Sequence, residues 1–255
     1  MAILEIKNIT RNFKGLTALH QIDAEVQEGE ILGVIGPNGA GKTTLFNIIS
    51  GFLKPSYGDI FFQGRSIVNL RPDEIVRKGI VRSFQGTSLF PAFSCLGNMI
   101  LAHHLHKEFG FWQTMLHSRS YRAREEEVAK KSLKILEDLN LADKRNVSAR
   151  DIPYGYQKML GIAMALATNA RLLLLDEPVA GMTPSEAIAM AEEIRKIRSE
   201  QGKTIVLVEH NMKTVMGVCD RIVVINHGVK IAEGAPEAIQ TNPQVIEAYL
   251  GADEN

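Results

Sequence analysis

Residues 36–44 of the chain are Gly36-Pro37-Asn38-Gly39-Ala40-Gly41-Lys42-Thr43-Thr44. An apolar run at 31–35 comes before them and is typical of a buried strand, and the run at 45–49 that follows is typical of the start of a helix. A GxxxxGK[ST] pattern between a strand and a helix predicts a phosphate-binding loop. The alternative interpretation is a plain glycine-rich turn, which this strand–loop–helix setting disfavours.

A loop of this kind holds a polyphosphate with its backbone N–H groups, and the amino end of the following helix adds positive charge. Lys42 is expected to reach the β- and γ-phosphates, and the Thr43 hydroxyl is expected to bind Mg²⁺. The sequence therefore predicts a nucleoside triphosphate site to which all of residues 36–44 contribute.

Composition sets wide bounds on the rest of the chain. At 255 residues, it is long enough for one large domain, or for a core with a subdomain. The 29 Lys and Arg residues balance the 29 Asp and Glu residues, so net charge gives no reason to expect a nucleic-acid partner. We expect no signal peptide and no membrane span, because no apolar run approaches the ~20 residues that a bilayer requires. Cys95 and Cys219 have no metal-ligand spacing and are expected to be reduced thiols.

The character of the sequence changes after Gln85. Residues 3–35 are mostly strand-like, whereas 86–150 have almost no strand signal and place apolar residues three or four apart, as in a helix. We therefore expect a single domain, 1–255, whose α/β core comprises 1–85 and 151–255 and carries a helical subdomain at 86–150.

Three histidines fall within that helical segment, at His103, His104 and His106. A metal site is one interpretation of these histidines, but no cysteine lies nearby at ligand spacing, and Glu108 is the only close carboxylate. A solvated loop or a surface that faces a partner is favoured, and the role of these histidines stays open.

Polar side chains follow two buried strands of the predicted core. Asp176 and Glu177 end the apolar run that begins at Leu172, and His210 follows the run 204–208. Parallel sheets place their ligands at the carboxyl ends of their strands. Asp176 is expected to hold Mg²⁺, Glu177 to act as the general base, and His210 to donate to the γ-phosphate. The alternative for the paired acids is a helix cap or a solvated turn.

Phe13 is a lone aromatic residue beside the first turn. It could cap the sheet, or it could stack on a nucleotide base, since a planar base needs a planar apolar partner. The residues alone leave both possibilities open.

Taken together and in order, these motifs resemble those of the ATP-binding subunits of ABC transporters. Residues 36–43 resemble their Walker A loop, 172–176 their Walker B strand, and Glu177 their catalytic glutamate. Gln85 resembles the Q-loop glutamine, which contacts the metal site and the transmembrane partner. His210 is similar to the switch histidine.

The resemblance implies a P-loop NTPase (RecA-like) core with an antiparallel β subdomain and an inserted helical subdomain. It implies ATP and Mg²⁺ as cofactors, with Thr43, Gln85 and Asp176 at the metal. It also favours adenine stacking for Phe13, and it implies an ATPase whose catalysis rests on Lys42, Glu177 and His210.

The chain departs from the family pattern at the signature loop, which is usually LSGGQ and closes the ATP site of a partner subunit. Aligned residues are 152–156, where Pro153 replaces the serine, Tyr156 replaces the glutamine, and Gly155 alone fits plainly as a contact in trans. The D-loop aspartate is also missing from 180–183. We therefore expect a weakened signature, which fits a heterodimer with a second, different ATP-binding subunit.

Within the family, four segments resemble the ATPases of branched-chain amino-acid uptake systems, although urea and amide importers share these features. The segments are 79–85, 109–124, 180–182 and 248–251. The resemblance implies two transmembrane permease subunits, an indirect link to an extracytoplasmic solute-binding protein, and a peripheral position on the cytoplasmic face of the inner or plasma membrane. The alternative functions are a soluble ABC ATPase that acts on nucleic acid or ribosomes and a nucleotide-gated switch with little turnover.

Overall fold

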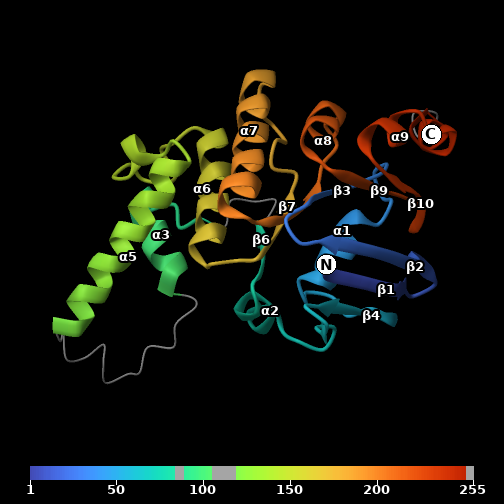
Figure 1. The fold of residues 1–255 in the computed structure, drawn as a ribbon, viewed down its shortest axis with the longest axis horizontal. Helices are drawn as coiled ribbons and strands as arrows, with labels where there is room; N and C mark the ends of the chain where they lie inside the picture. The colour runs from blue at the N-terminus through green and yellow to red at the C-terminus, as the bar shows by residue number, and fades with distance from the viewer. Residues whose placement is uncertain (84–88, 105–118, 251–255) are drawn as a thin grey trace. The chain divides into compact units, whose positions relative to one another are not determined.

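The structure is a computed structural model that describes residues 1–83, 89–104 and 119–250 (Figure 1). Its elements, in chain order, are β1 (Ala2–Phe13), β2 (Leu16–Gln27), β3 (Ile31–Ile35), α1 (Lys42–Ile49), β4 (Tyr57–Phe62), β5 (Arg65–Ser66), α2 (Pro72–Lys78), β6 (Ile80–Ser83), α3 (Cys95–His104), α5 (Arg119–Asp138), the 3₁₀ helix η1 (Ala142–Lys144), α6 (Tyr154–Ala167), β7 (Leu172–Asp176), α7 (Pro184–Gln201), β8 (Thr204–Val208), α8 (Met212–Val218), β9 (Arg221–Asn226), β10 (Val229–Gly234), α9 (Pro236–Gln240) and α10 (Pro243–Leu250).

The chain forms two compact units. One comprises Met1–Arg82 and Arg171–Asn255, and the other comprises Ser83–Ala170. The helical segment expected from the sequence ends at residue 150, whereas the second unit continues to Ala170. The difference arises because α6 packs with α3 and α5, so the helix after residue 150 belongs with the helical unit rather than with the α/β core.

A mainly parallel sheet forms the centre of the first unit, with the strand order β10-β9-β3-β8-β7-β6. Strand β3 lies between β8 and β9, parallel to both, and β7 runs parallel to β8. Every residue of β3, β7 and β8 is buried, as their unbroken apolar runs predict. The three strands point the same way, so the loops that follow them emerge at one edge of the sheet.

A second sheet, antiparallel and in the order β2-β1-β4-β5, shares a hydrophobic core with the first. Helix α1 contributes Phe46 to this core, where it lies with Leu4 of β1, Ile22 of β2 and Val34 of β3. The expectation of an α/β core with an antiparallel β subdomain is confirmed.

The helices of the second unit bury an apolar interior of their own. Met99 of α3, Leu136 of α5 and Leu160 of α6 are each fully buried. The helical spacing noted within 86–150 is confirmed in α5, which buries Leu136.

Local signals in the carboxyl-terminal half also form the structures that they predict. Helix α7 begins with a capping box, in which the Thr183 N–H donates to the Glu186 carboxylate at 2.8 Å. Strands β9 and β10 form a hairpin around His227, and α9 and α10 follow it. Among the helices of the described residues, none has the length and apolar character to cross a membrane.

Candidate nucleotide-binding site

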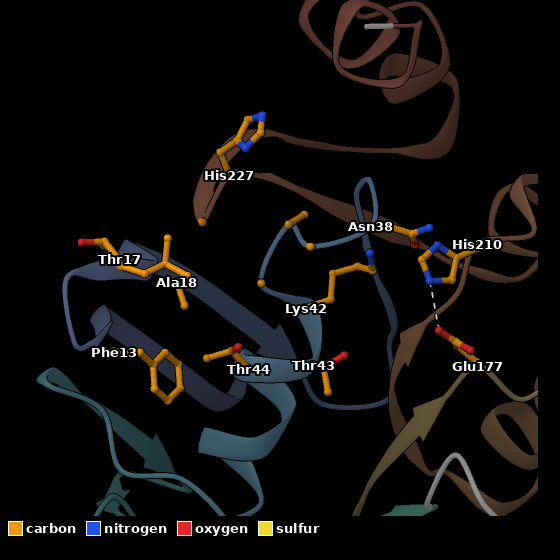
Figure 2. A pocket seen from close by; sticks show the side chains of 15 residues that line it. Phe13, Thr17, Ala18, Asn38, Lys42, Thr43, Thr44, Glu177, His210 and His227 are labelled. Carbon is orange, nitrogen blue, oxygen red and sulfur yellow. Dashed lines mark hydrogen bonds and ion pairs between the residues drawn. The ribbon is translucent and has the colours of Figure 1, made fainter. Parts of the chain in front are cut away.

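A cavity of ≈ 510 Å³ opens at the edge of the central sheet where the parallel strands end, within the size range of small-molecule sites (Figure 2). We call it the loop cavity. Its lining comes from the adjoining ends of β1 and β2, from the loop after β3 and the first turn of α1, and from the segments after β7, β8 and β9: Phe13, Leu16, Thr17, Ala18, Asn38, Gly39, Ala40, Gly41, Lys42, Thr43, Thr44, Glu177, His210, His227 and Gly228.

The loop after β3 folds tightly against its neighbours at two glycines. A Cβ on Gly36 would lie 1.9 Å from the carbonyl oxygen of Ile225, and a Cβ on Gly41 would lie 2.7 Å from that of Ala18. Both glycines have a positive φ, +153° and +107°, so a side chain is excluded by backbone conformation as well as by space. The loop can therefore bring its backbone close to a ligand only with glycine at these positions.

Helix α1 begins at this loop with its backbone donors available. Its N-cap, Gly41, has no side chain to cap the helix, and the first turn contains no acidic residue. A helix start of this kind attracts anions through its N–H groups and its dipole. The loop and the helix start therefore fit a phosphate chain.

Lys42 is buried beneath the loop, with 6% of its surface exposed. Its ammonium group donates to the carbonyl oxygens of Gly36 at 2.7 Å and Pro37 at 2.8 Å. Burial lowers the pKa of Lys42, and the negative charges of Glu177 and Asp176 act in the opposite direction. A buried cation that is bonded to neutral carbonyls fits a site for an anionic ligand.

Glu177 and His210 meet at one end of the loop cavity. His210 Nε2 lies 3.0 Å from Glu177 Oε1, and Figure 2 shows the two side chains facing one another. Glu177 has a φ of +49°, which is uncommon for a residue with a side chain. Its N–H donates to the Val208 carbonyl at 2.8 Å, which holds the backbone in this conformation. The carboxylate is therefore fixed in place beside an imidazole.

Phe13 lines the opposite end of the same cavity (Figure 2). Its side chain is 39% exposed, and the Arg11 guanidinium carbon lies 4.5 Å from the ring centroid. The phosphate-binding loop lies between Phe13 and the Glu177–His210 pair. This arrangement fits a nucleotide whose base lies at Phe13 and whose terminal phosphate lies near Glu177.

Asp176 lies at the end of β7 and is almost fully buried. Its Oδ2 accepts a hydrogen bond of 2.6 Å from Nη2 of Arg82, on β6. Thr43 lines the loop cavity, and its hydroxyl with the Asp176 carboxylate supplies the oxygen ligands that Mg²⁺ prefers. This donor set fits a magnesium ion.

The lining of the loop cavity does not include every predicted residue, since Gly36, Pro37 and Asp176 are absent from it. Gln85 and His106 fall outside the described residues. Gly155 belongs to the other compact unit, in the first turn of α6, where Pro153 is the N-cap and makes no side-chain hydrogen bond. No cluster of three or more potential metal ligands occurs in the described parts of the chain, which include the side chain of His103 but not that of His104.

The sequence interpretation missed several residues that line the cavity or support it. His227 and Gly228 follow β9, so the strand-end argument that found Asp176 would have found them had β9 been placed in the parallel sheet. Thr17 and Ala18 come from β2 and had no local signal of this kind. Arg82 and Glu209 were also missed, because a charged residue near the end of a strand gives no indication of its partner.

Glu209 is a buried carboxylate that joins two of the loops. It accepts hydrogen bonds from the backbone N–H groups of Val179 at 2.8 Å, His210 at 3.0 Å and Asn211 at 3.3 Å. The segment that follows Glu177 is thereby attached to the segment that carries His210. The geometry of the Glu177–His210 pair depends on this attachment.

These features define the class of protein: an α/β nucleotide-binding protein with a phosphate-binding loop, and with acidic and histidine side chains at the neighbouring strand ends. Comparisons with known proteins narrow the class. The family model described as "ABC transporter" matches residues 19–180, and that described as "Branched-chain amino acid ATP-binding cassette transporter" matches residues 229–255.

Individual proteins agree with these matches. The chain is 42% identical, over 249 residues and 98% of each chain, to the high-affinity branched-chain amino acid transport ATP-binding protein BraF of Pseudomonas aeruginosa. It is similar to a solved ATP-binding cassette of an ABC transporter in its ADP conformation, with a TM-score of 0.86, 32% identity, and 98% of this chain and 99% of that chain covered. A dimeric ATP-binding cassette in a post-hydrolysis state, bound to ADP and phosphate, gives a TM-score of 0.77 and 26% identity over 91% of this chain and 98% of its own.

The chain belongs to the ABC transporter family, as one of its ATP-binding cassettes. The resemblance stated from the sequence, the P-loop NTPase fold and the assignment as an ATPase are confirmed.

Proposed function

We propose that this chain hydrolyses ATP to drive the uptake of branched-chain amino acids through an ABC importer. The substrate is assigned from the match of residues 229–255 to the branched-chain family model, and the 42% identity to BraF supports this assignment. Uptake of urea or amides is the alternative, and an uptake assay distinguishes it from uptake of branched-chain amino acids.

ATP binds in the loop cavity with its adenine on Phe13 and its phosphates on residues 36–44. The positions of Phe13 and Glu177 at opposite ends of the cavity support this orientation (Figure 2). Lys42 turns its ammonium from the carbonyls of Gly36 and Pro37 toward the β- and γ-phosphates. This exchange replaces two neutral acceptors with charged ones, which strengthens the hydrogen bonds.

Thr43 and Asp176 would hold Mg²⁺, and Gln85 is proposed as a further ligand. When bound, the ion would neutralise charge on the β- and γ-phosphate oxygens. The position of Asp176 at the carboxyl end of β7 supports this role, because parallel sheets place their ligands at the ends of their strands.

Glu177 acts as the general base. Its carboxylate accepts a proton from the attacking water, and His210 orients that carboxylate and donates to the γ-phosphate. The 3.0 Å contact between His210 and Glu177 and the constrained backbone of Glu177 support these roles.

A second, different ATP-binding subunit completes the motor. The dimeric cassette among the similar structures supports pairing of two such chains, and Gly155 is proposed as a contact to the partner's ATP. Pro153 has neither a hydroxyl nor an N–H to offer a γ-phosphate, so the signature of this chain contributes less than that of its partner. This asymmetry favours a heterodimer.

Two permease subunits carry the solute across the membrane, and this chain attaches to them as a peripheral subunit on the cytoplasmic face. A solute-binding protein outside the membrane acts on the complex only through the permease. Because the permease and the binding protein hold the solute, no residue of this chain touches it.

The proposal is tested by uptake in a strain of the native host that lacks this gene. Wild type should restore uptake of radiolabelled leucine, and Glu177→Gln should not. Restored uptake of urea without leucine would identify the amide importer instead. Complexes that contain wild type but turn over ATP no faster than those with Glu177→Gln would favour the nucleotide-gated switch that Pro153 suggests.

A further inference from the structure

Arg82 makes a buried network that joins three elements of the first unit. Its guanidinium donates to Asn47 Oδ1 on α1 and to Asp176 Oδ2 on β7, at 2.6 Å in each case. The side chains of Arg82 and Asp176 are 7% and 2% exposed. The guanidinium carbon also lies 5.6 Å from the ring centroid of Phe46, which is buried in the core.

A buried ion pair is a costly way to connect strands. Both ions lose their hydration, and apolar residues of similar volume would often serve the fold as well. The full positive charge of Arg82 beside Asp176 therefore needs an explanation other than packing. The Asp176 carboxylate is also the proposed ligand of Mg²⁺, so Arg82 and Mg²⁺ would compete for it.

Lys42 is a second cation that interacts with Asp176, but its hydrogen bonds go elsewhere. Lys42 interacts electrostatically with Asp176 and Glu177, but its hydrogen bonds go to the carbonyls of Gly36 and Pro37. Within the described parts of the chain, Arg82 is therefore the cation that is hydrogen-bonded to Asp176. With Lys42, it balances the two acids Asp176 and Glu177.

We propose that Arg82 is a positioning residue that serves as the counter-ion of Asp176 in the metal-free state. Mg²⁺ arriving with ATP competes with the guanidinium for the charge of this carboxylate. Arg82 thereby sets how strongly nucleotide binding depends on Mg²⁺. The inference rests on the proposed role of Asp176 at the metal.

The test measures the affinity of the full chain for a fluorescent, non-hydrolysable ATP analogue, once in excess EDTA and once in excess Mg²⁺. The ratio of the two dissociation constants is the coupling between metal and nucleotide. Arg82→Met leaves the Asp176 charge unbalanced, which weakens binding in EDTA and strengthens it in Mg²⁺. The ratio should rise about 5-fold or more, the lower end of typical coupling between two sites.

An arginine that served only to support the fold would give the opposite result, because a loosened Asp176 would bind metal less well. Arg82→Lys keeps the charge and should leave the ratio near that of wild type. Arg82→Gln is uncharged and can still hydrogen-bond, so it should raise the ratio even if Arg82→Met does not fold. Arg221→Met removes a less buried arginine of the same unit, which pairs with Glu30 at 2.7 Å and with Glu233, and should leave the ratio unchanged.

Asp176→Asn separates this inference from the proposed function. It should lower the ratio, and Arg82→Met in the same chain should then raise it no further. If the ratio does not rise in Arg82→Met or Arg82→Gln, or if Arg82→Met raises it equally in the Asp176→Asn chain, the proposed role of Arg82 is wrong. The proposed metal site is not affected by that result. If the wild-type ratio is near one and Asp176→Asn does not alter it, then Asp176 does not hold the metal. The inference about Arg82 then fails as well.

Discussion

Nε2 of His210 lies 3.0 Å from Oε1 of Glu177, although 33 residues separate the two in the chain. They meet because β7 and β8 are neighbours in the sheet, with Asp176 paired to Val208. Each residue follows the end of its strand, so the parallel pairing of the strands places an acid beside a histidine.

Glu177→Gln should retain ATP and lose hydrolysis by about 100-fold or more, the range typical of a missing general base. Glutamine keeps the size of the side chain but cannot accept a proton. Phosphate release from the assembled complex and the dissociation rate of labelled ATP measure the two effects. ATP dissociation as fast as in wild type would mean that another group is the base.

Lys42→Ala should weaken ATP binding by at least about tenfold, because it removes a charge-assisted bond to the phosphates. The rise in thermal unfolding temperature on addition of ATP should be lost accordingly. Lys230→Ala is the matched control, since Lys230 pairs with Glu233 and lies outside the loop cavity. Equal effects of the two changes would contradict the role of Lys42.

Phe13→Ala should reduce ATP affinity by about fivefold to tenfold, as loss of one base-stacking contact of ~1–3 kcal/mol allows. Phe13→Trp should restore the affinity, and its fluorescence should change when ATP binds. Affinity for inorganic triphosphate should not change in either variant, because that ligand has no base. A similar loss for triphosphate would show that Phe13 acts on the fold of the loop rather than on adenine.

Glu209→Ala should destabilise the protein by about 1–3 kcal/mol, because buried N–H groups lose their acceptor. Two of those groups belong to Val179 and His210, so hydrolysis should fall more than ATP binding. Chemical denaturation and a comparison of kcat with KM measure these effects. Glu192→Ala, on α7, is an acidic control for stability, and an equal loss there would remove the case for Glu209.

Gly36→Ala should destabilise the protein by about 1–3 kcal/mol, the usual cost of forcing extra atoms into a packed site. Its Cβ would meet the carbonyl oxygen of Ile225 at 1.9 Å. Gly39 also has a positive φ, but a Cβ there meets nothing within 4 Å, so Gly39→Ala should cost less. Thermal unfolding without nucleotide compares the two variants, and equal losses would show that conformation rather than space makes glycine necessary.

The sequence predicted those features that depend on neighbours in the chain. The glycine pattern at 36–44, the buried run 172–176 and the capping box at Thr183 each form the expected structure. Such patterns carry information because a helix, a strand or a tight turn restricts the backbone of consecutive residues. The same patterns, through family resemblance, identified the cassette family.

Strand order was beyond the reach of these local patterns. Arg82 and Asp176 are 94 residues apart, and the sequence around neither residue indicates that they pair. The extent of the helical unit likewise depends on packing, because α6, which follows residue 150, contacts α3 and α5 in that unit.

By itself, then, the sequence determined the phosphate-binding loop, the acids and histidine at the strand ends, and the family. Only the tertiary structure decided that Glu177 faces His210, that Glu209 joins their two loops, and that Arg82 neutralises Asp176. The reason is physical: local sequence fixes the conformation of a segment, whereas contacts between charged groups depend on which strands lie side by side. That choice is made by the packing of the whole core.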